Sequence, residues 1–91
     1  MKIERAYYLC EYCILVFFSN GKQKIINFQP LLLKYAKGHY SKYLKQTLFT
    51  KFQVANGNIS WGKNEDIIFP VSFLYNNRNA KIQKEEILYV I

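Results

Sequence analysis

Residues 12–28 constrain the fold more than any other stretch of the chain. An unbroken run of apolar and aromatic residues at 12–18 is followed by Asn20-Gly21 and by a second segment that ends at Phe28. Asn-Gly between two strand-like runs is a strong β-hairpin signal, because both central residues of a type I′ turn need a positive φ. The stretch therefore predicts an antiparallel hairpin that later segments cover.

The register of this hairpin depends on the length of its loop. A loop of two or four residues would pair Leu15 with Ile26 and place both in the core. The same face would then carry Cys13, Phe17, Lys24 and Phe28. An odd loop length would change these partners and move the side chains of one strand to the opposite face. The second face is half apolar as well, so the outgoing strand is expected to be central or covered on both sides.

A second hairpin and several short helices are expected elsewhere. Asn56-Gly57 repeats the turn signal and would pair Val54 with Ile59, with Phe52 opposite Trp61. Pro30 suits the first turn of a helix and Gly38 suits its end. Ser41 is a candidate cap for a second helix. We also expect strands at 3–10 and 65–69, a short helix at 70–75, and a bulge or short turn at Glu11.

These elements predict an α+β fold: a small antiparallel sheet built from two β-hairpins plus a short strand, packed with two or three short helices. A chain of 91 residues makes one domain with a modest core. We assign residues 1–76 to this domain. Residues 77–91 form a C-terminal extension of uncertain structure, because the pattern at 81–91 fits a helix or a strand.

The net charge of +7 has two readings. A basic protein attracts anionic partners such as nucleic acid or an acidic protein. Abundant Lys, Ile, Asn and Tyr also follow from AT-rich coding, in which case the charge has no function. The chain shows no signal peptide and no apolar run of the roughly 20 residues that span a bilayer. Two cysteines fit a reducing compartment, so we expect a soluble cytoplasmic protein with no membrane association.

Six short motifs follow one another along the chain: Phe-Phe-Ser-Asn-Gly-Lys at 17–22, Phe-Gln-Pro-Leu-Leu at 28–32, Phe49, Asn-Ile-Ser-Trp-Gly at 58–62, Asp-Ile at 66–67 and Leu-Tyr at 74–75. Their order resembles that of a small prokaryotic family, domain of unknown function 2442. The resemblance implies an α+β domain with an antiparallel sheet and no known catalysis. Two departures stand out: Asn27 takes the capping place of an acid, and the loop after Trp61 has a different order of residues.

Residues able to carry chemistry are few. Cys10 and Cys13 form a C-x-x-C, but residues three apart on a strand point to opposite faces. Zinc needs four ligands, so only a site shared across a dimer, with His39 nearby, would suit it. His39 is expected in a solvated loop, and no pair of carboxylates has a catalytic spacing. The sequence therefore predicts no enzyme, no catalytic residue, no metal and no cofactor.

A basic cluster is the strongest candidate for a binding face. Four lysines fall within twelve residues and alternate with tyrosines: Lys34, Lys37, Lys42 and Lys45, interleaved with Tyr35, Tyr40 and Tyr43, of which Tyr40 and Tyr43 are the candidates for the binding face. Lysines can neutralise phosphates, and exposed tyrosine rings can stack on bases. In the alternative reading, the tyrosines pack on the sheet and the lysines only solvate the surface.

Two functions from different classes therefore stand as hypotheses. The first is a protein-binding adaptor or an antitoxin-like regulatory or accessory module, which binds a protein partner or a second copy of itself through a sheet edge. The apolar segment 87–91 is a candidate for that pairing. The second is a nucleic-acid-binding module that uses the Lys/Tyr-rich face.

Overall fold

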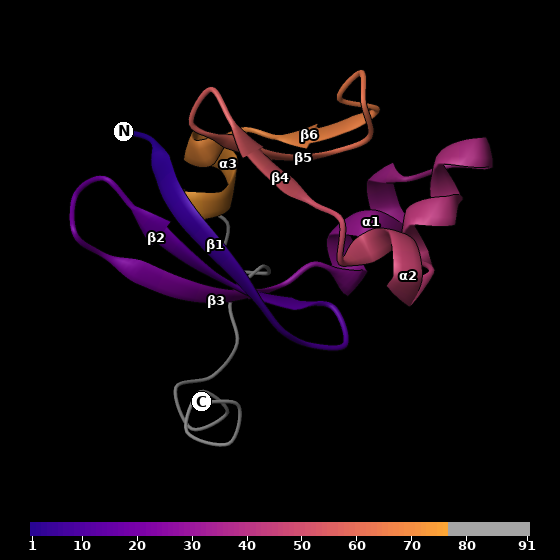
Figure 1. Ribbon diagram of the computed structural model, residues 1–91, viewed down its shortest axis with the longest axis horizontal. Helices are drawn as coiled ribbons and strands as arrows, with labels where there is room; N and C mark the ends of the chain where they lie inside the picture. The colour runs from indigo at the N-terminus through magenta and orange to yellow at the C-terminus, as the bar shows by residue number, and fades with distance from the viewer. Residues whose placement is uncertain (77–91) are drawn as a thin grey trace.

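Two three-stranded antiparallel sheets form the framework of the protein in a computed structural model that describes residues 1–76 (Figure 1). The first sheet has the order β1-β2-β3, built from β1 (Ile3–Cys10), β2 (Cys13–Phe18) and β3 (Gln23–Asn27). The second has the order β4-β5-β6, built from β4 (Gln53–Ala55), β5 (Asn58–Trp61) and β6 (Ile67–Phe69). The α+β class is confirmed, with the two hairpins in separate sheets rather than in one.

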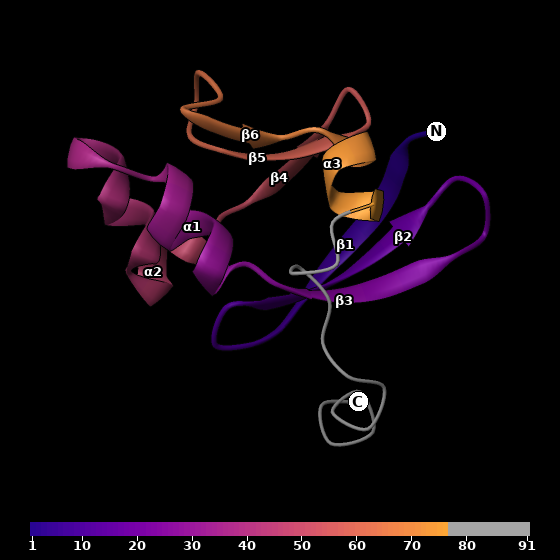
Figure 2. The same ribbon diagram turned by 180° about the vertical axis from the view of Figure 1, so that it is seen from behind.

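Short helices close the two ends of the space between the sheets. The chain runs from β3 into α1 (Gln29–Tyr35), a 3-10 helix η1 (Gly38–Leu44) and α2 (Gln46–Phe49). After β6 it forms α3 (Val71–Asn76). Figures 1 and 2 show the sheets facing each other, with α3 at one end and α1 and α2 at the other. The predicted C-terminal extension, and the choice between helix and strand at 81–91, lie outside the described residues.

The second helix departs from its prediction. Lys45 is extended, with φ −74° and ψ 132°, and divides the segment into η1 and α2. Ser41 consequently lies within η1 and does not cap a helix. The first helix is as expected at its start, where Pro30 occupies the first turn. Asn27 Oδ1 accepts a hydrogen bond of 3.0 Å from the backbone N–H of Gln29, so its side chain does satisfy a donor at this helix start.

The first hairpin has an odd loop, and the even-loop register was wrong. Phe18 N donates to Lys22 O across a three-residue loop, and Gly21 alone in this loop has a positive φ, of 88°. Leu15 therefore pairs with Ile25, and Ile14 pairs with Ile26. The outgoing strand is turned over relative to the prediction, which buries Ile14, Val16 and Phe18 instead of Cys13, Leu15 and Phe17. Ile26 and Phe28 are buried as predicted.

The second hairpin has the predicted register. Val54 pairs with Ile59 and Gln53 with Ser60. Asn56 and Gly57 have φ values of 55° and 79°, as a type I′ turn requires. The turn also joins the two sheets, since Ile3 N donates a 2.9 Å hydrogen bond to Gly57 O.

Trp61 lies at the centre of the core. Its ring contacts Phe28, Phe49 and Phe69 at centroid distances of 5.4–6.0 Å, so it joins the second sheet to α2 and to the start of α1. The indole Nε1–H donates a 2.8 Å hydrogen bond to the carbonyl oxygen of Phe49. Because both groups are buried, the polar atom of this large side chain is satisfied inside the core.

The third helix is held to the first hairpin by Tyr75. Its ring packs edge-on against Phe18 at 5.0 Å, and its hydroxyl accepts a 3.1 Å hydrogen bond from Asn20 Nδ2. The Lys24 ammonium donates to the carbonyl oxygen of Tyr75. These contacts fix α3 and, through it, one wall of the groove described next.

Candidate functional site: an aromatic groove beside strand β6

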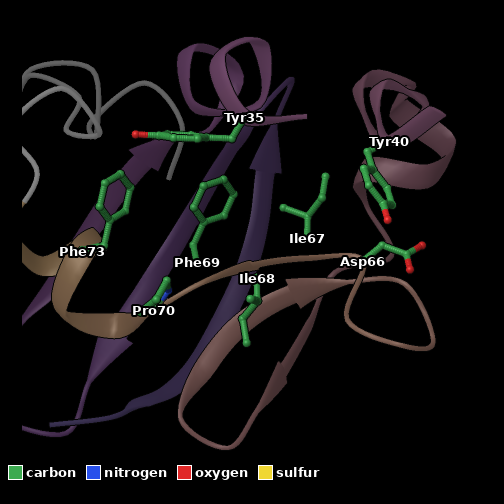
Figure 3. A pocket seen from close by; sticks show the side chains of 8 residues that line it. All are labelled: Tyr35, Tyr40, Asp66, Ile67, Ile68, Phe69, Pro70 and Phe73. Atoms are coloured by element: carbon green, nitrogen blue, oxygen red, sulfur yellow. The ribbon is translucent and has the colours of Figure 1, made fainter. Parts of the chain in front are cut away.

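A groove of about 530 Å³ runs between the α1–η1 segment and the β6–α3 segment (Figure 3). This volume is in the range of ligand-binding clefts. Its walls consist mainly of aromatic and aliphatic side chains, with one carboxylate: Tyr35, Tyr40, Asp66, Ile67, Ile68, Phe69, Pro70 and Phe73. The two ends of the groove differ in chemistry.

One end is aromatic. Tyr35 of α1 meets Phe69 of β6 and Phe73 of α3 edge-on, at centroid distances of 6.2 and 6.0 Å. Phe69 and Phe73 stack with their planes 18° apart. Tyr35 is half exposed, and Phe69 is buried beneath it. An apolar side chain entering here would find rings on several sides.

The opposite end is acidic. Figure 3 shows Asp66 and Tyr40 together, away from the aromatic cluster. Asp66 Oδ2 accepts a 2.6 Å hydrogen bond from the Tyr43 hydroxyl. This hydrogen bond, the burial of the phenol and the negative charge of Asp66 together raise the pKa of Tyr43 to about 12. Tyr43 therefore stays a neutral donor at physiological pH and holds the carboxylate in place.

Gly62 makes room for this hydrogen bond. It has a φ of 92°, and a Cβ placed on it would lie 2.6 Å from the Tyr43 hydroxyl oxygen and 2.7 Å from Asp66 Oδ2. Only glycine has both the conformational freedom and the absence of a side chain that this position needs.

In the described part of the chain, the groove follows a free edge of the second sheet. β6 is the last strand of its sheet, and β5 is its partner through Ile59↔Phe69, Ser60↔Ile68 and Trp61↔Ile67. Within residues 1–76, Ile67–Phe69 have no other backbone hydrogen bond. Ile68 is 40% exposed on the face of the strand opposite to the buried Ile67 and Phe69, so an apolar side chain stands open to solvent at this edge. An unpaired edge beside an apolar groove is a ready template for another strand.

The predicted basic cluster is divided between exposed and buried groups. Lys34, Lys37, Lys42 and Lys45 are all exposed, and the ring of Tyr40 is 37% exposed. Tyr43 is buried and bonded to Asp66, so its ring is not available for stacking on a base. The whole stretch 12–64 contains no Asp or Glu, so no acid of that stretch offsets these lysines.

The cysteines lie differently from their prediction. Because the chain turns at Glu11, where φ is 47°, Cys10 and Cys13 are direct partners in the β1–β2 register. Directly opposed residues share one face, so the expectation of opposite faces was wrong. His39 is exposed and lies against the Tyr40 ring at 4.3 Å. Among residues 1–76, no three His, Cys, Asp or Glu side chains are grouped so as to hold a metal ion.

The comparison with family models decides the relationship of the chain to known proteins. The model described as "Protein of unknown function (DUF2442)" matches residues 3–79. The chain belongs to the DUF2442 family. The resemblance inferred from the motifs is confirmed, and it covers all of the elements described above. No curated protein and no solved structure matches the chain.

The DUF2442 motifs acquire structural roles in this chain. Gly62 and Asp66 frame the acidic end of the groove, and Ile67 begins the strand along it. The Asn-Gly pair at 20–21 lies in the loop of the first hairpin. Within the described part of the chain, no helix is both long and apolar enough to cross a lipid bilayer.

The groove itself was not predicted. Its lining residues come from two segments that are far apart in the chain, 35–40 and 66–73. In the sequence, Asp66 stands beside Glu65 at a spacing that suggests no shared site. The one local signal was the uninterrupted apolar run Ile67-Ile68-Phe69-Pro70 after Asp66, which leaves an apolar side chain exposed in a three-residue strand.

Proposed function

We propose that this DUF2442 protein is a protein-binding module that receives a segment of its partner in the aromatic groove beside β6. An adaptor or an antitoxin-like regulatory module would use such a surface in the same way, by holding a second protein. In this proposal it works in the cytoplasm of a bacterial cell, where both thiols stay reduced. A second copy of the chain is a partner of the same kind.

The observation that carries this proposal is the combination of the groove with the unpaired edge of β6. An extended peptide can satisfy the free backbone groups of an edge strand, and adjacent pockets can then select its side chains. The exposed Ile68 and the ring of Tyr35 supply apolar surface at this place. A lining of this kind, apolar with one carboxylate, suits the recognition of side chains.

A displayed library of random nonapeptides tests this function without knowledge of the partner. We expect enrichment of a recurring peptide pattern on the wild-type protein and its loss on Ile68→Lys, which places a charge in the groove. Leu33→Lys is a matched control, because Leu33 is 54% exposed on α1 and lies outside the groove. Equal enrichment on both variants, or none on the wild type, would contradict the proposal.

A second candidate function is nucleic-acid binding through the α1–η1–α2 segment. The four exposed lysines of the basic cluster favour it, together with the exposed ring of Tyr40 and the lack of acids in residues 12–64. Lysine has no bidentate fork for base edges, so this binding would follow the phosphate backbone and read little sequence.

Fluorescence anisotropy with a labelled 20-nucleotide single strand tests this candidate. Binding should weaken steeply as salt rises, and it should fall when Lys34, Lys37, Lys42 and Lys45 are changed to Gln. The control changes the same number of exposed lysines elsewhere: Lys2, Lys22, Lys51 and Lys63. If both quadruple variants lose affinity equally, the charge of the whole protein accounts for binding and the local face does not.

A further inference from the structure

We infer that the groove selects an extended segment with a Lys or Arg beside Asp66 and a bulky apolar side chain at the aromatic end. This inference rests on the proposed function and names the chemistry of the partner segment. The segment would lie along β6 as an added strand. Its cationic side chain would then contact Asp66, and its apolar side chain would occupy the aromatic end of the groove.

The charge distribution points to a cationic occupant. Among residues 1–76, Asp66 is the only acidic group that lines the groove, in a chain whose net charge is +7. The carboxylate accepts a hydrogen bond from the neutral hydroxyl of Tyr43, which does not neutralise its charge. Within residues 1–76, no Lys or Arg forms an ion pair with Asp66. A Lys or Arg from a partner would make a charge-assisted hydrogen bond in a site walled by apolar groups.

The dimensions of the groove set the spacing of the two side chains. Asp66 and Phe69 are three positions apart, and extended chain rises about 3.3 Å per residue, so the ends are separated by about 10 Å. A strand beside β6 would therefore place its cation and its bulky residue two or four positions apart, since side chains an even number of positions apart share one face of a strand. Tyr35 and Phe73 would pack against the apolar side chain at the far end.

The same carboxylate disfavours a polyanion in the groove. A phosphate brought next to Asp66 would meet a like charge that no cation among the described residues offsets. Nucleic acid, if it binds, is therefore expected on the exposed lysines and away from Asp66.

The experiment measures peptide affinity by fluorescence polarisation. The probes are the nonapeptide most enriched by the wild-type protein and three synthetic relatives, in which its basic residue is replaced by norleucine, by Glu, or by the alternative basic residue. Norleucine keeps the four-carbon apolar stem of Lys and removes the ammonium group, with its charge and its N–H donors. We expect norleucine to weaken binding about tenfold and Glu to weaken it further, while Lys and Arg stay within a few-fold of each other.

The matched protein variants are Asp66→Asn and Tyr43→Phe. Asp66→Asn keeps an oxygen that can accept from Tyr43 but removes the charge, so it should abolish the preference for Lys over norleucine. Tyr43→Phe keeps the charge but releases the carboxylate from its hydrogen bond, so the affinity should fall while the preference for Lys over norleucine survives. Far-ultraviolet circular dichroism checks that both variants are folded.

The possible outcomes distinguish failure of the proposed peptide-binding function from failure of the inference that the bound segment is cationic. If no peptide is enriched, the proposed function fails. If peptides are enriched without a basic residue, or if Asp66→Asn keeps the preference, the function stands and the cationic segment is wrong. Enrichment of acidic peptides that bind through the lysines, or self-association detected by light scattering and lost in Ile68→Lys, would each replace the proposed occupant.

Discussion

Tyr43 and Asp66, 23 positions apart in the chain, are joined by a 2.6 Å hydrogen bond from the phenol hydroxyl to Oδ2. Tyr43 belongs to η1, and Asp66 lies directly before β6. The bond therefore ties the helical wall of the groove to its sheet wall and fixes the position of the acidic end. Changes to these two residues should affect both stability and binding.

The hydrogen bond predicts a distinctive response to alkaline pH. The pKa of Tyr43 is raised to about 12 in the folded protein, against about 10 for an unperturbed tyrosine in the unfolded chain. The folded state holds this proton more tightly, so the stabilisation is complete below pH 10 and is lost as the pH rises toward 12. Wild-type protein should lose more stability than Tyr43→Phe across this window, measured by urea unfolding at several pH values.

Absorbance at 295 nm provides an independent check on the same group. Titration of the folded protein should include one tyrosinate transition near pH 12, and Tyr43→Phe should remove it. At neutral pH the same variant should lose about 1.5–3 kcal/mol of unfolding free energy, because one hydrogen bond to a charged group is missing. A variant with unchanged stability and an unchanged absorbance titration would show that the hydrogen bond is not formed in solution.

Gly62→Ala should lower the free energy of unfolding more than a substitution of another glycine with a similar positive φ. The new Cβ would collide with the Tyr43 hydroxyl and the Asp66 carboxylate, so we expect a loss of about 2–3 kcal/mol. Gly21→Ala is the control, because Gly21 has a φ of 88° and a methyl group added there would have no atom within 4 Å. That variant should lose only about 1 kcal/mol. Equal losses would mean that the Tyr43–Asp66 pair contributes nothing at this position.

Trp61→Phe tests the centre of the core. The smaller ring leaves a cavity, and the buried carbonyl of Phe49 loses its donor, so the expected loss is about 2–4 kcal/mol. Circular dichroism is the appropriate measurement, since the substitution removes the one tryptophan of the chain. Phe52→Leu, at a half-buried ring that contacts the same indole at 6.3 Å, should lose clearly less.

The register of the first hairpin can be tested with adjacent residues. Ile14 is fully buried and Leu15 is half-buried on the other face, and truncation to Ala removes three carbons from each. Ile14→Ala should lose about 3–4 kcal/mol and Leu15→Ala about 1–2 kcal/mol. The reverse order would favour the even-loop register, in which Leu15 faces the core.

Local signals in the sequence were sufficient to predict the strand register of the second hairpin and insufficient to predict that of the first. At Asn56-Gly57 both turn residues take positive φ, and one face of the ribbon is clearly more apolar, so turn chemistry and burial agree. In the first hairpin both faces of β2 are apolar, so the hydrophobic pattern does not distinguish registers that differ by one residue. The deciding bond, from Phe18 N to Lys22 O, depends on the conformation of the loop.

Contacts between distant segments were beyond sequence reasoning. The groove exists because Tyr35 of α1 comes to lie over Phe69 of β6. No periodic pattern in the sequence predicts this contact between distant segments. Tyr43 is a similar case. Its position among lysines favoured a binding role, whereas in the fold it is buried behind the groove and donates a hydrogen bond to Asp66.

Hydrogen–deuterium exchange with the most enriched nonapeptide tests the central claim most directly. If the peptide adds a strand to β6, amides in segment 66–73 should exchange more slowly when it is bound. The exchange rates of amides in β1 and on the outer surface of α1 should not change. Slower exchange confined to residues 34–45, with no change at 66–73, would contradict the account and direct attention to the basic face.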